Sequence, residues 1–357
     1  MEAFLMRDMK IGSHWIASDA PAFVIAEIGV NHNGDLALAK HMVMEAKRAG
    51  ADCVKFQTFK AERVVTARAE KAQYQKLSTD PAESQLDMLR KLELPDAYYP
   101  ELLALCDEQE ILFLSTPYGA EDVDLLKRYD VPAYKVASAM CVEPQFLRRV
   151  GREGRPVILS TGMAELGEVE EGIEAVRAGG SEDIILMQCT TDYPARLEDT
   201  NMRAMQTLSA AFGLPVGFSD HTQSHTASVL AVALGARVIE KHFTTDKSLP
   251  GPDQSTSADA AEFAQLVRAI RECETALGSP IKKPGERERI NAVGMRRSIV
   301  SKAAIPAGTK ITGDMLTFKR PATGIAPREF DQLVGSIAKT DIAADAVLRW
   351  SSFERLD

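Results

Sequence analysis

The chain has 357 residues, 45% of them hydrophobic, and a formal net charge of −9 at pH 7. That length allows a large core with a small second domain, and the acidic balance argues against nucleic acid or an anionic membrane as partner. The five cysteines include no CxxC pair, which argues against a disulfide framework or a zinc knuckle and predicts a cytoplasmic protein. No apolar run approaches the ~20 residues that a membrane-spanning helix needs.

Short apolar runs alternate with longer amphipathic stretches in the first part of the chain. The runs with the length and composition of buried strands are residues 23–28, 53–58, 111–115, 133–138, 157–161, 184–189, 216–219 and 238–243. The stretches with a helical period include residues 36–49, 123–129, 169–178 and 226–234. This alternation predicts an α/β fold with a parallel sheet, closed as a TIM (β/α)8 barrel, although a doubly wound sheet would alternate in the same way.

Two segments interrupt or follow this pattern. Residues 62–95 are polar and long, and we expect an irregular excursion over the mouth of the barrel. After a helix at residues 259–277, the basic sequence SPIKKPGERER contains two prolines and a glycine, which is typical of a linker. We therefore expect a catalytic barrel over residues 1–280, a linker over 281–294 and a small β-rich domain over 295–357.

Polar side chains stand at the ends of all the predicted barrel strands, where barrel enzymes carry their chemistry. Lys55 and Lys135 lie on inner strand faces, and a phosphate or carboxylate would neutralise them there. Their alternative role is an ion pair with Glu27 or Glu240. The hydroxyl groups that could share such an anion are those of Thr116, Ser138, Ser160 and Thr161.

Two histidines end adjacent predicted strands, so their imidazoles can converge. His221 follows the seventh strand, and His242 follows Glu240 on one face of the eighth. Imidazole suits Mn, Zn, Fe or Co, and a carboxylate nearby favours a harder ion. A pair of hydrogen-bonded core histidines is the alternative interpretation.

These residues fall in motifs that resemble the sialic acid synthases, together with their legionaminic acid, pseudaminic acid and spore-coat polysaccharide relatives. The motifs occur in the order of the family and span nearly the whole chain. They are AEIGVNHNG (26–34), VKFQT (54–58), STPY (115–118), PAYKVAS (132–138), ILSTGM (158–163), CTTDYP (189–194), SDHT (219–222), EKHFT (240–244), PGPD (250–253) and KRPATGI (319–325).

The resemblance implies a TIM barrel followed by a small antifreeze-like (SAF) domain, in a domain-swapped homodimer whose SAF domain covers the partner's active site. It also implies an activity. A metal-dependent enzyme would join phosphoenolpyruvate to an open-chain N-acetylated amino sugar, giving a nine-carbon nonulosonic acid and phosphate by C–O cleavage. The sugar would be N-acetylmannosamine or a 2,4-diacetamido-6-deoxy hexose.

The resemblance also implies a role for each site residue. Mn²⁺, or alternatively Mg²⁺ or Co²⁺, would be bound by His221 and His242. Glu27 and Glu240 would be the catalytic carboxylates, with Glu27 transferring a proton. Phosphoenolpyruvate would be held by Lys55, Thr116, Lys135, Ser138 and Ser160. The sugar would be contacted by Gln57, Tyr193, Asp253 and, from the other subunit, Arg320.

Two positions depart from the family pattern. Met140 stands where the family often has Glu, and Thr191 stands where it has Asn, so a carboxylate and a phosphoenolpyruvate contact are changed. Two other functions therefore stay open. One is a Schiff-base aldolase with Lys135 or Lys55 as nucleophile, and the other is a non-catalytic carbohydrate-binding protein.

Overall fold

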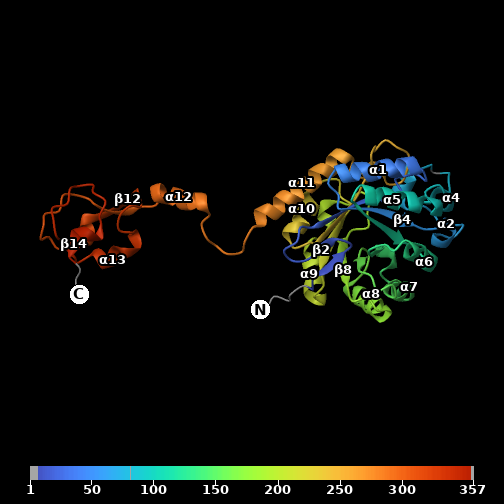
Figure 1. Ribbon diagram of the computed structural model, residues 1–357, viewed down its shortest axis with the longest axis horizontal. Helices are drawn as coiled ribbons and strands as arrows, with labels where there is room; N and C mark the ends of the chain where they lie inside the picture. Colours follow the sequence, from blue (N-terminus) through green and yellow to red (C-terminus); the bar gives the residue numbers. More distant parts are fainter. Residues whose placement is uncertain (1–6, 81, 355–357) are drawn as a thin grey trace. The chain divides into compact units, whose positions relative to one another are not determined.

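The computed structural model describes residues 7–80 and 82–354. The chain divides into two compact units, the first ending at Gly278 and the second beginning at Ser279. Figure 1 shows a sheet surrounded by helices in the first unit and small strands with short helices in the second.

Eight parallel strands form the sheet of the first unit, in the order β5-β4-β3-β10-β9-β8-β7-β6. β5 and β6 end this order and lie next to each other, so the sheet is nearly closed and the expected TIM barrel is confirmed. The strands are β3 (Phe23–Gly29), β4 (Cys53–Thr58), β5 (Leu112–Pro117), β6 (Tyr134–Val136), β7 (Val157–Ser160), β8 (Ile184–Cys189), β9 (Val216–Asp220) and β10 (Val238–His242).

Helices cover the outside of the barrel (Figure 1). They are α1 (Leu36–Arg48), α5 (Tyr99–Glu108), α6 (Ala120–Arg128), α7 (Pro144–Gly151), α8 (Leu166–Gly179), α9 (Arg203–Phe212), α10 (Thr226–Ala233) and α11 (Ala260–Leu277). In α1 the buried residues Ala39, Met42, Val43 and Ala46 recur at helical spacing and face the sheet. Alternate strand residues therefore pack outward against helices or inward into the barrel.

A hairpin that the sequence pattern did not predict fills the N-terminal end of the barrel. It consists of β1 (Met9–Ile11) and β2 (His14–Ile16), paired antiparallel. Met9, Ile11 and Ile16 are buried and pack in one apolar cluster with inward-facing strand residues. Strands of three residues are too short for a periodic signal, which explains why they were missed.

The excursion expected at residues 62–95 contains three short helices joined by irregular backbone, so the expectation of an irregular segment is confirmed only in part. It contains α2 (Ala61–Val64), α3 (Gln73–Ser78) and α4 (Gln85–Arg90). Buried Lys71 contacts Thr79 Oγ1 at 2.9 Å and the carbonyl of Asp80 at 2.8 Å, and these contacts hold the turn after α3. The segment lies at the mouth of the barrel, as predicted, because several of its side chains line the cavity there.

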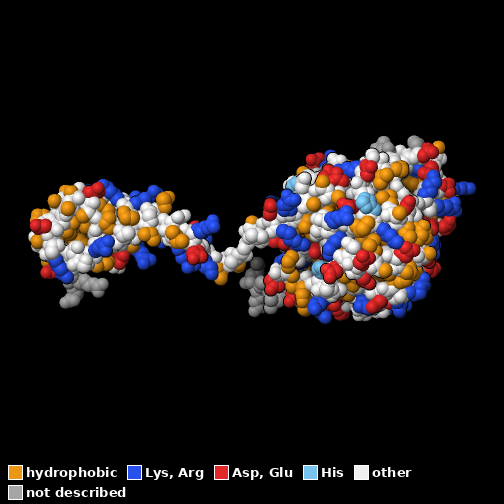
Figure 2. Space-filling view, turned by 45° about the horizontal axis from the view of Figure 1, so that its top comes forward, with side chains coloured by type: hydrophobic (Ala, Val, Ile, Leu, Met, Phe, Trp, Pro, Cys, Tyr) orange, Lys and Arg blue, Asp and Glu red, His pale blue; other side chains and the backbone are white. Residues whose placement is uncertain are grey.

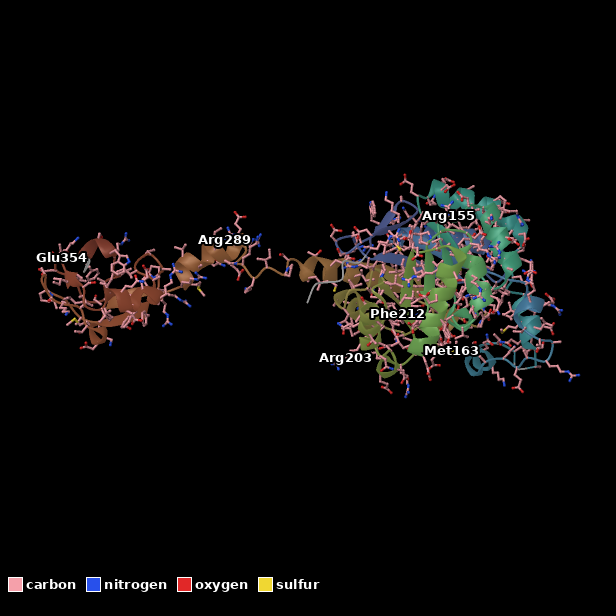
Figure 3. All side chains as sticks on the ribbon, turned by 90° about the horizontal axis from the view of Figure 1, so that it is seen from below. Arg155, Met163, Arg203, Phe212, Arg289 and Glu354 are labelled. Carbon is pink, nitrogen blue, oxygen red and sulfur yellow. The ribbon has the colours of Figure 1, made fainter. Side chains whose placement is uncertain are left out.

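The second unit has its own apolar core, which includes Ile299, Leu316, Leu333 and Phe353. Its first element is α12 (Glu286–Met295), a helix that covers most of the linker expected at 281–294, and its Arg289 is labelled in Figure 3. The others are β11 (Ser298–Ser301), β12 (Leu316–Lys319), α13 (Phe330–Leu333), β13 (Ile337–Ala338) and β14 (Phe353–Glu354). The 3-10 turns of the two units are η1 (Asp96–Tyr98), η2 (Ser138–Met140), η3 (Leu197–Asp199), η4 (Gln254–Thr256), η5 (Gly313–Met315), η6 (Pro327–Glu329) and η7 (Trp350–Ser352).

On the face of the barrel unit seen in Figure 2, acidic and basic side chains are interspersed. Among the described residues, no helix combines the length and apolar character needed to cross a membrane.

Candidate active site

A cavity of about 400 Å³ opens at the carboxyl ends of the barrel strands. The predicted site residues that line it are Glu27, Lys55, Gln57, Thr116, Lys135, Ser138, Ser160, Tyr193, His221, Glu240, His242 and Asp253. Arg320 is an exposed residue of the second unit. Its role therefore stays a prediction.

Strand register brings the first charged residues together. β3 pairs with β4 so that Glu27 lies beside Lys55, and with β10 so that Glu27 lies beside His242. Lys55 Nζ is 2.6 Å from Glu27 Oε2 and donates to Thr116 Oγ1 at 2.9 Å. All these side chains are almost fully buried except that of His242, which is about one tenth exposed.

A second lysine lies across the cavity floor, with Glu240 between the two. Lys135 Nζ donates to Ser160 Oγ at 2.6 Å and is 3.8 Å from Glu240 Oε1. Lys55 Nζ is likewise 3.8 Å from Glu240 Oε2. The two lysines therefore share one glutamate at long distance, and the charge of Lys135 has no short ion pair among the described residues.

The protonation of this floor follows from burial and from its neighbours. Burial lowers the pKa of Lys135, whereas at Lys55 the carboxylates of Glu240 and Glu27 outweigh burial and the pKa is raised. Burial raises the pKa of Glu27 against the opposing effect of Lys55. At Glu240 burial is outweighed by Lys135, Lys55 and His221, so its pKa is lowered. Glu240 is thus the carboxylate that stays ionised, and Glu27 is the one that more readily holds a proton.

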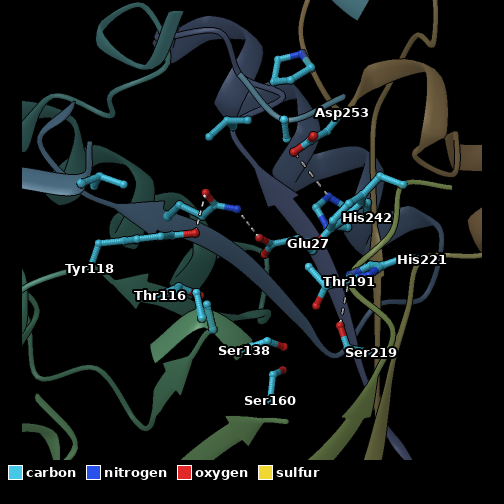
Figure 4. A pocket seen from close by; sticks show the side chains of 18 of the residues that line it. Glu27, Thr116, Tyr118, Ser138, Ser160, Thr191, Ser219, His221, His242 and Asp253 are labelled. Carbon is cyan, nitrogen blue, oxygen red and sulfur yellow. Dashed lines mark hydrogen bonds and ion pairs between the residues drawn. The ribbon is translucent and has the colours of Figure 1, made fainter. Parts of the chain in front are cut away.

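Beyond Ser160, a narrow backbone turn brings several hydroxyl groups together. The N–H of Gly162 donates to Ser138 Oγ at 3.0 Å. A Cβ added at Gly162 would lie 2.5 Å from Thr191 Oγ1 and 2.8 Å from Ser138 Oγ. Glycine is therefore required for this approach of the backbone, and the hydroxyls gather around it in the manner of an anion cradle. Figure 4 shows Ser138 and Ser160 together at this side of the cavity.

The two histidines lie opposite, with ring centroids 5.4 Å apart (Figure 4). His221 Nδ1 is 2.7 Å from the carbonyl of Thr190, so it carries the proton, and Nε2, which lies 3.5 Å from Ser219 Oγ, is the nitrogen that could bind a metal. His242 Nδ1 is buried without a hydrogen-bond partner and lies 3.9 Å from Asp253 Oδ2. Burial, together with the positive charges of His221 and Lys55, lowers the pKa of His242 well below its usual value. The lowered pKa favours the neutral form of His242, which is the form that binds metals, whereas at His221 burial is outweighed by Cys189 and the Thr190 carbonyl and the pKa is raised.

These nitrogens fit the divalent metal that the resemblance implies. The described residues contain no group of three or more His, Cys, Asp or Glu side chains placed to hold a metal ion. An ion at His221 and His242 would therefore take two nitrogen ligands from the barrel and leave its other positions for oxygen atoms of water or substrate. The orphaned Nδ1 of His242 is consistent with such a ligand.

The remaining predicted sugar contacts lie next to Glu27 or to the histidines. Gln57 Nε2 donates to Glu27 Oε1 at 3.0 Å, and the Tyr193 ring lies 4.1 Å from that of His221, centroid to centroid. Burial, with the negative charge of Glu27, raises the pKa of Asp253 to about 6. These groups can donate and accept hydrogen bonds along a polyhydroxy chain.

A second buried network holds the loop of His221 from outside the barrel. Lys241, between Glu240 and His242, points away from the cavity, and its Nζ is 3.1 Å from Asp220 Oδ2. It also donates to the carbonyl of Thr222 at 2.6 Å, and Ser228 Oγ donates to Asp220 Oδ2 at 2.6 Å. Lys241 and Asp220 therefore fix the backbone on both sides of His221.

Several cavity residues were not predicted. Tyr118 donates to Gln57 Oε1 at 3.3 Å, and its place in the STPY motif was the available signal. Cys189 and Met163 also line the cavity. Met163, which is labelled in Figure 3, has a backbone φ of +66°, and 68% of its surface is exposed. Of the two residues that depart from the family pattern, Met140 is buried in the apolar core and Thr191 lines the cavity.

Comparison with known proteins identifies the family. Residues 42–282 match the NeuB family, and residues 296–354 match the SAF domain. The chain belongs to the NeuB family. N,N'-diacetyllegionaminic acid synthase of Legionella pneumophila is 43% identical over 341 residues, covering 94% of this chain and 96% of its own.

Two other NeuB relatives bear on the site. N-acetylneuraminate-9-phosphate synthase of Mus musculus is 35% identical over 342 residues, covering 95% of each chain. The crystal structure of N-acetylneuraminic acid synthetase from Leptospira borgpetersenii, in complex with citrate, superposes with a TM-score of 0.71 at 31% identity, covering 80% of this chain and 95% of that one. The chain is therefore a synthase, which confirms the predicted family.

Proposed function

We propose that this NeuB protein condenses phosphoenolpyruvate with an open-chain N-acetylated amino sugar in the presence of a divalent metal. The products would be a nine-carbon nonulosonic acid and phosphate. The observation that carries the proposal is the placement of two buried lysines and two adjacent histidines in one cavity. Mn²⁺ is the ion we expect, with Mg²⁺ or Co²⁺ as alternatives.

The floor would bind phosphoenolpyruvate. Lys55 and Lys135 supply positive charge, and Thr116, Ser138 and Ser160 supply hydroxyl donors around it. Because the ionised Glu240 lies between the lysines, it is placed to stabilise positive charge that develops at C2 of phosphoenolpyruvate during the reaction. Most of the rate enhancement would thus come from positioning and from fixed charges.

The balance of the reaction assigns a proton to Glu27. C3 of phosphoenolpyruvate bonds to the aldehyde carbon of the sugar, water adds to C2, and phosphate leaves as the C2–O bond breaks. A metal at His221 and His242 would polarise the aldehyde as a Lewis acid. The aldehyde oxygen gains a proton, and Glu27, whose pKa burial raises, is the carboxyl group placed beside His242 to donate it.

The relatives guide the choice of sugar. The identity of 43% to a legionaminic acid synthase exceeds the 35% to an N-acetylneuraminate-9-phosphate synthase. We therefore expect a 2,4-diacetamido-6-deoxy hexose in preference to N-acetylmannosamine.

We also propose the domain-swapped homodimer, in which Arg320 of one subunit would contact the acylamino group of the sugar bound in the other subunit. Mixing Arg320→Ala with His221→Ala subunits should then restore part of the activity that each variant lacks, and failure to do so would contradict the swap.

Phosphate release tests the proposed function. Purified protein with Mn²⁺ should release phosphate from phosphoenolpyruvate only when a suitable amino sugar is present, and a chelator should abolish the release. With ¹⁸O in the bridging C2–O–P position, the label should appear in phosphate, whereas label retained in the sugar acid would exclude C–O cleavage.

Metal analysis tests the two histidines. His221→Ala and His242→Ala should lose bound Mn²⁺, and the control His225→Ala, at an exposed position, should retain it.

A further inference from the structure

The second unit contains a cavity that is lined by arginines and is here named the arginine cavity. It has a volume of about 490 Å³ and lies between the residues that precede β11 and the loop that follows β12. The described residues that line it include Arg296, Arg297 and Arg328, with Met295, Ala322 and Pro327 as apolar neighbours, and none of them is acidic. Arg320, the predicted sugar contact, is not among the residues that line it.

The three arginines have no counterion among the described residues. They are exposed, and they form no ion pair or side-chain hydrogen bond within that part of the chain. The carboxylate next to them in sequence is already bound. Glu329 Oε2 accepts from the N–H of Ala326 at 3.0 Å, and Glu329 Oε1 accepts from Nε1 of Trp350 at 3.1 Å. Residues 279–357 contain 14 lysines and arginines but only 9 aspartates and glutamates, so the unit has a surplus of positive charge for an anion from outside.

A cavity of the barrel unit provides a comparison, because it also has three cationic side chains. It has a volume of about 290 Å³, and its cations are Lys127, Arg152 and Arg155. Asp130 and Glu153 line the same cavity. Lys127 Nζ is 3.2 Å from Glu153 Oε2, and Arg155 forms an ion pair with Asp130. The barrel cavity thus supplies its own carboxylates, whereas the described lining of the arginine cavity supplies none.

Hydrogen bonds hold the backbone of the arginine cavity in place. Ser298 Oγ donates to the carbonyl of Pro321 at 2.7 Å and accepts from the N–H of Gly324 at 2.9 Å. The N–H of Ala322 donates to the carbonyl of Val293 at 2.8 Å, which ties the loop to α12. A Cβ added at Gly324 would lie 2.3 Å from a backbone carbonyl oxygen, so glycine is required there. A cavity with a fixed backbone loses little conformational entropy when a ligand binds.

We propose that the arginine cavity binds the phosphate group of a small organic molecule. Guanidinium groups donate paired hydrogen bonds to phosphate oxygens, and a doubly charged phosphate neutralises more of them than a carboxylate does. The volume is in the range of cavities that hold small organic ligands, and Met295 and Pro327 offer apolar surface to the organic part. The site goes beyond the proposed function and does not rest on it, because it uses no residue of the barrel.

Modification of individual arginines tests the site in the full-length chain. The protein would be treated with phenylglyoxal at constant ionic strength, and modified peptides would be quantified by mass spectrometry. Inorganic phosphate or phenyl phosphate at about ten times its Kd should slow the modification of Arg297 and Arg328 about tenfold relative to chloride, because only the unoccupied cavity reacts. Phenyl phosphate should act at the lower concentration, because its ring contacts the apolar neighbours.

The control is Arg349, an exposed arginine of the same unit outside the cavity lining, whose modification rate should not change. No protection of Arg297 and Arg328, or equal protection of Arg349, would overturn the site. Equal potency of the two compounds would refute an organic ligand. Slow modification of Arg297 without any added anion, relieved by diluting the protein, would show that a second copy covers the cavity and would overturn the small-molecule ligand.

A variant tests whether the arginines share one phosphate. Arg328→Gln should raise about tenfold the concentration of phenyl phosphate that protects Arg297, because one charged contact to the shared group is lost. Arg349→Gln, the matched control, should leave that concentration unchanged. If folded Arg328→Gln protects Arg297 at the wild-type concentration, the arginines act separately and the cavity is not a single binding site.

Discussion

Strand β10 separates two buried charge clusters that differ in how well their charges are satisfied. Inside the barrel, the carboxylate of Glu240 lies 3.8 Å from the ammonium groups of both Lys55 and Lys135. Its Oε2 has no hydrogen-bond partner in the described structure. Outside, Lys241 lies 3.1 Å from Asp220 and 2.6 Å from the carbonyl of Thr222. The residues alternate along one strand, so neighbours in sequence belong to opposite clusters.

The difference indicates what each cluster is for. A buried charge with short contacts on all sides stabilises the chain around it and has little capacity for a ligand. A buried charge with long contacts beside a cavity gains partners only when a ligand binds. The outer cluster should therefore govern folding stability, and the inner cluster should govern binding and catalysis.

The largest expected effect concerns the inner cluster. Lys135→Met should lower kcat/KM for phosphoenolpyruvate about a thousandfold or more, because a buried cation facing the substrate anion is lost. Its free energy of unfolding should fall by less than about 1 kcal/mol or should rise, because burial already disfavours this charge. Phosphate release and urea unfolding measure the two. A large loss of stability would contradict the division between the clusters, and the exposed Lys127→Met is the control.

The outer cluster should respond in the opposite way. Lys241→Met leaves the Asp220 carboxylate buried without its cation, which should cost about 3–5 kcal/mol of unfolding free energy. Urea unfolding measures this loss. Lys247→Met removes the more exposed pair with Glu262 and should cost under about 1 kcal/mol. Similar losses in the two variants would show that burial does not distinguish these ion pairs.

A buried base near neither cluster gives a pH-dependent effect. Burial lowers the pKa of His32 to about 4, below its unfolded value near 6.5, and its Nδ1 accepts from the N–H of Gly34. A lowered folded pKa means that stability is complete above pH 6.5 and is lost as pH falls toward 4, by about 3 kcal/mol. Denaturant unfolding from pH 7.5 to 4.5 should show that His32→Gln lacks this loss. The exposed His41→Gln should retain it, and parallel curves for wild type and His32→Gln would refute the account.

The smallest expected effect comes from adding a methyl group, without a change of charge, at the turn beside the inner cluster. Gly162→Ala places a methyl group against Thr191 and Ser138, so the KM for phosphoenolpyruvate should rise about tenfold. Gly167→Ala, where a Cβ meets nothing within 4 Å, should leave the KM unchanged and stabilise α8 by up to about 1 kcal/mol. If the two variants have the same KM, the turn at Gly162 does not bind the anion.

Sequence reasoning predicted the features that repeat and missed those that depend on long-range packing. The barrel followed from strand–helix alternation, and Glu27, Lys55 and Glu240 followed from strand parity at the carboxyl ends. By the same parity, Lys241 could have been assigned to the outside. The part of the cavity lining that comes from α4 had no signal, because Met88 looks like an ordinary residue of an amphipathic segment until the segment folds over the cavity. The hairpin β1–β2 was too short for a period.

That hairpin has a kinetic consequence. Met9, Ile11 and Ile16 fill the N-terminal end of the barrel, so in the described part of the chain the cavity is closed at its floor. On the proposed function, the compound held at the floor has to arrive first and depart last. Steady-state kinetics should then be ordered, with phosphoenolpyruvate binding before the sugar. Phosphate, the last product to dissociate, should inhibit competitively against phosphoenolpyruvate and noncompetitively against the sugar.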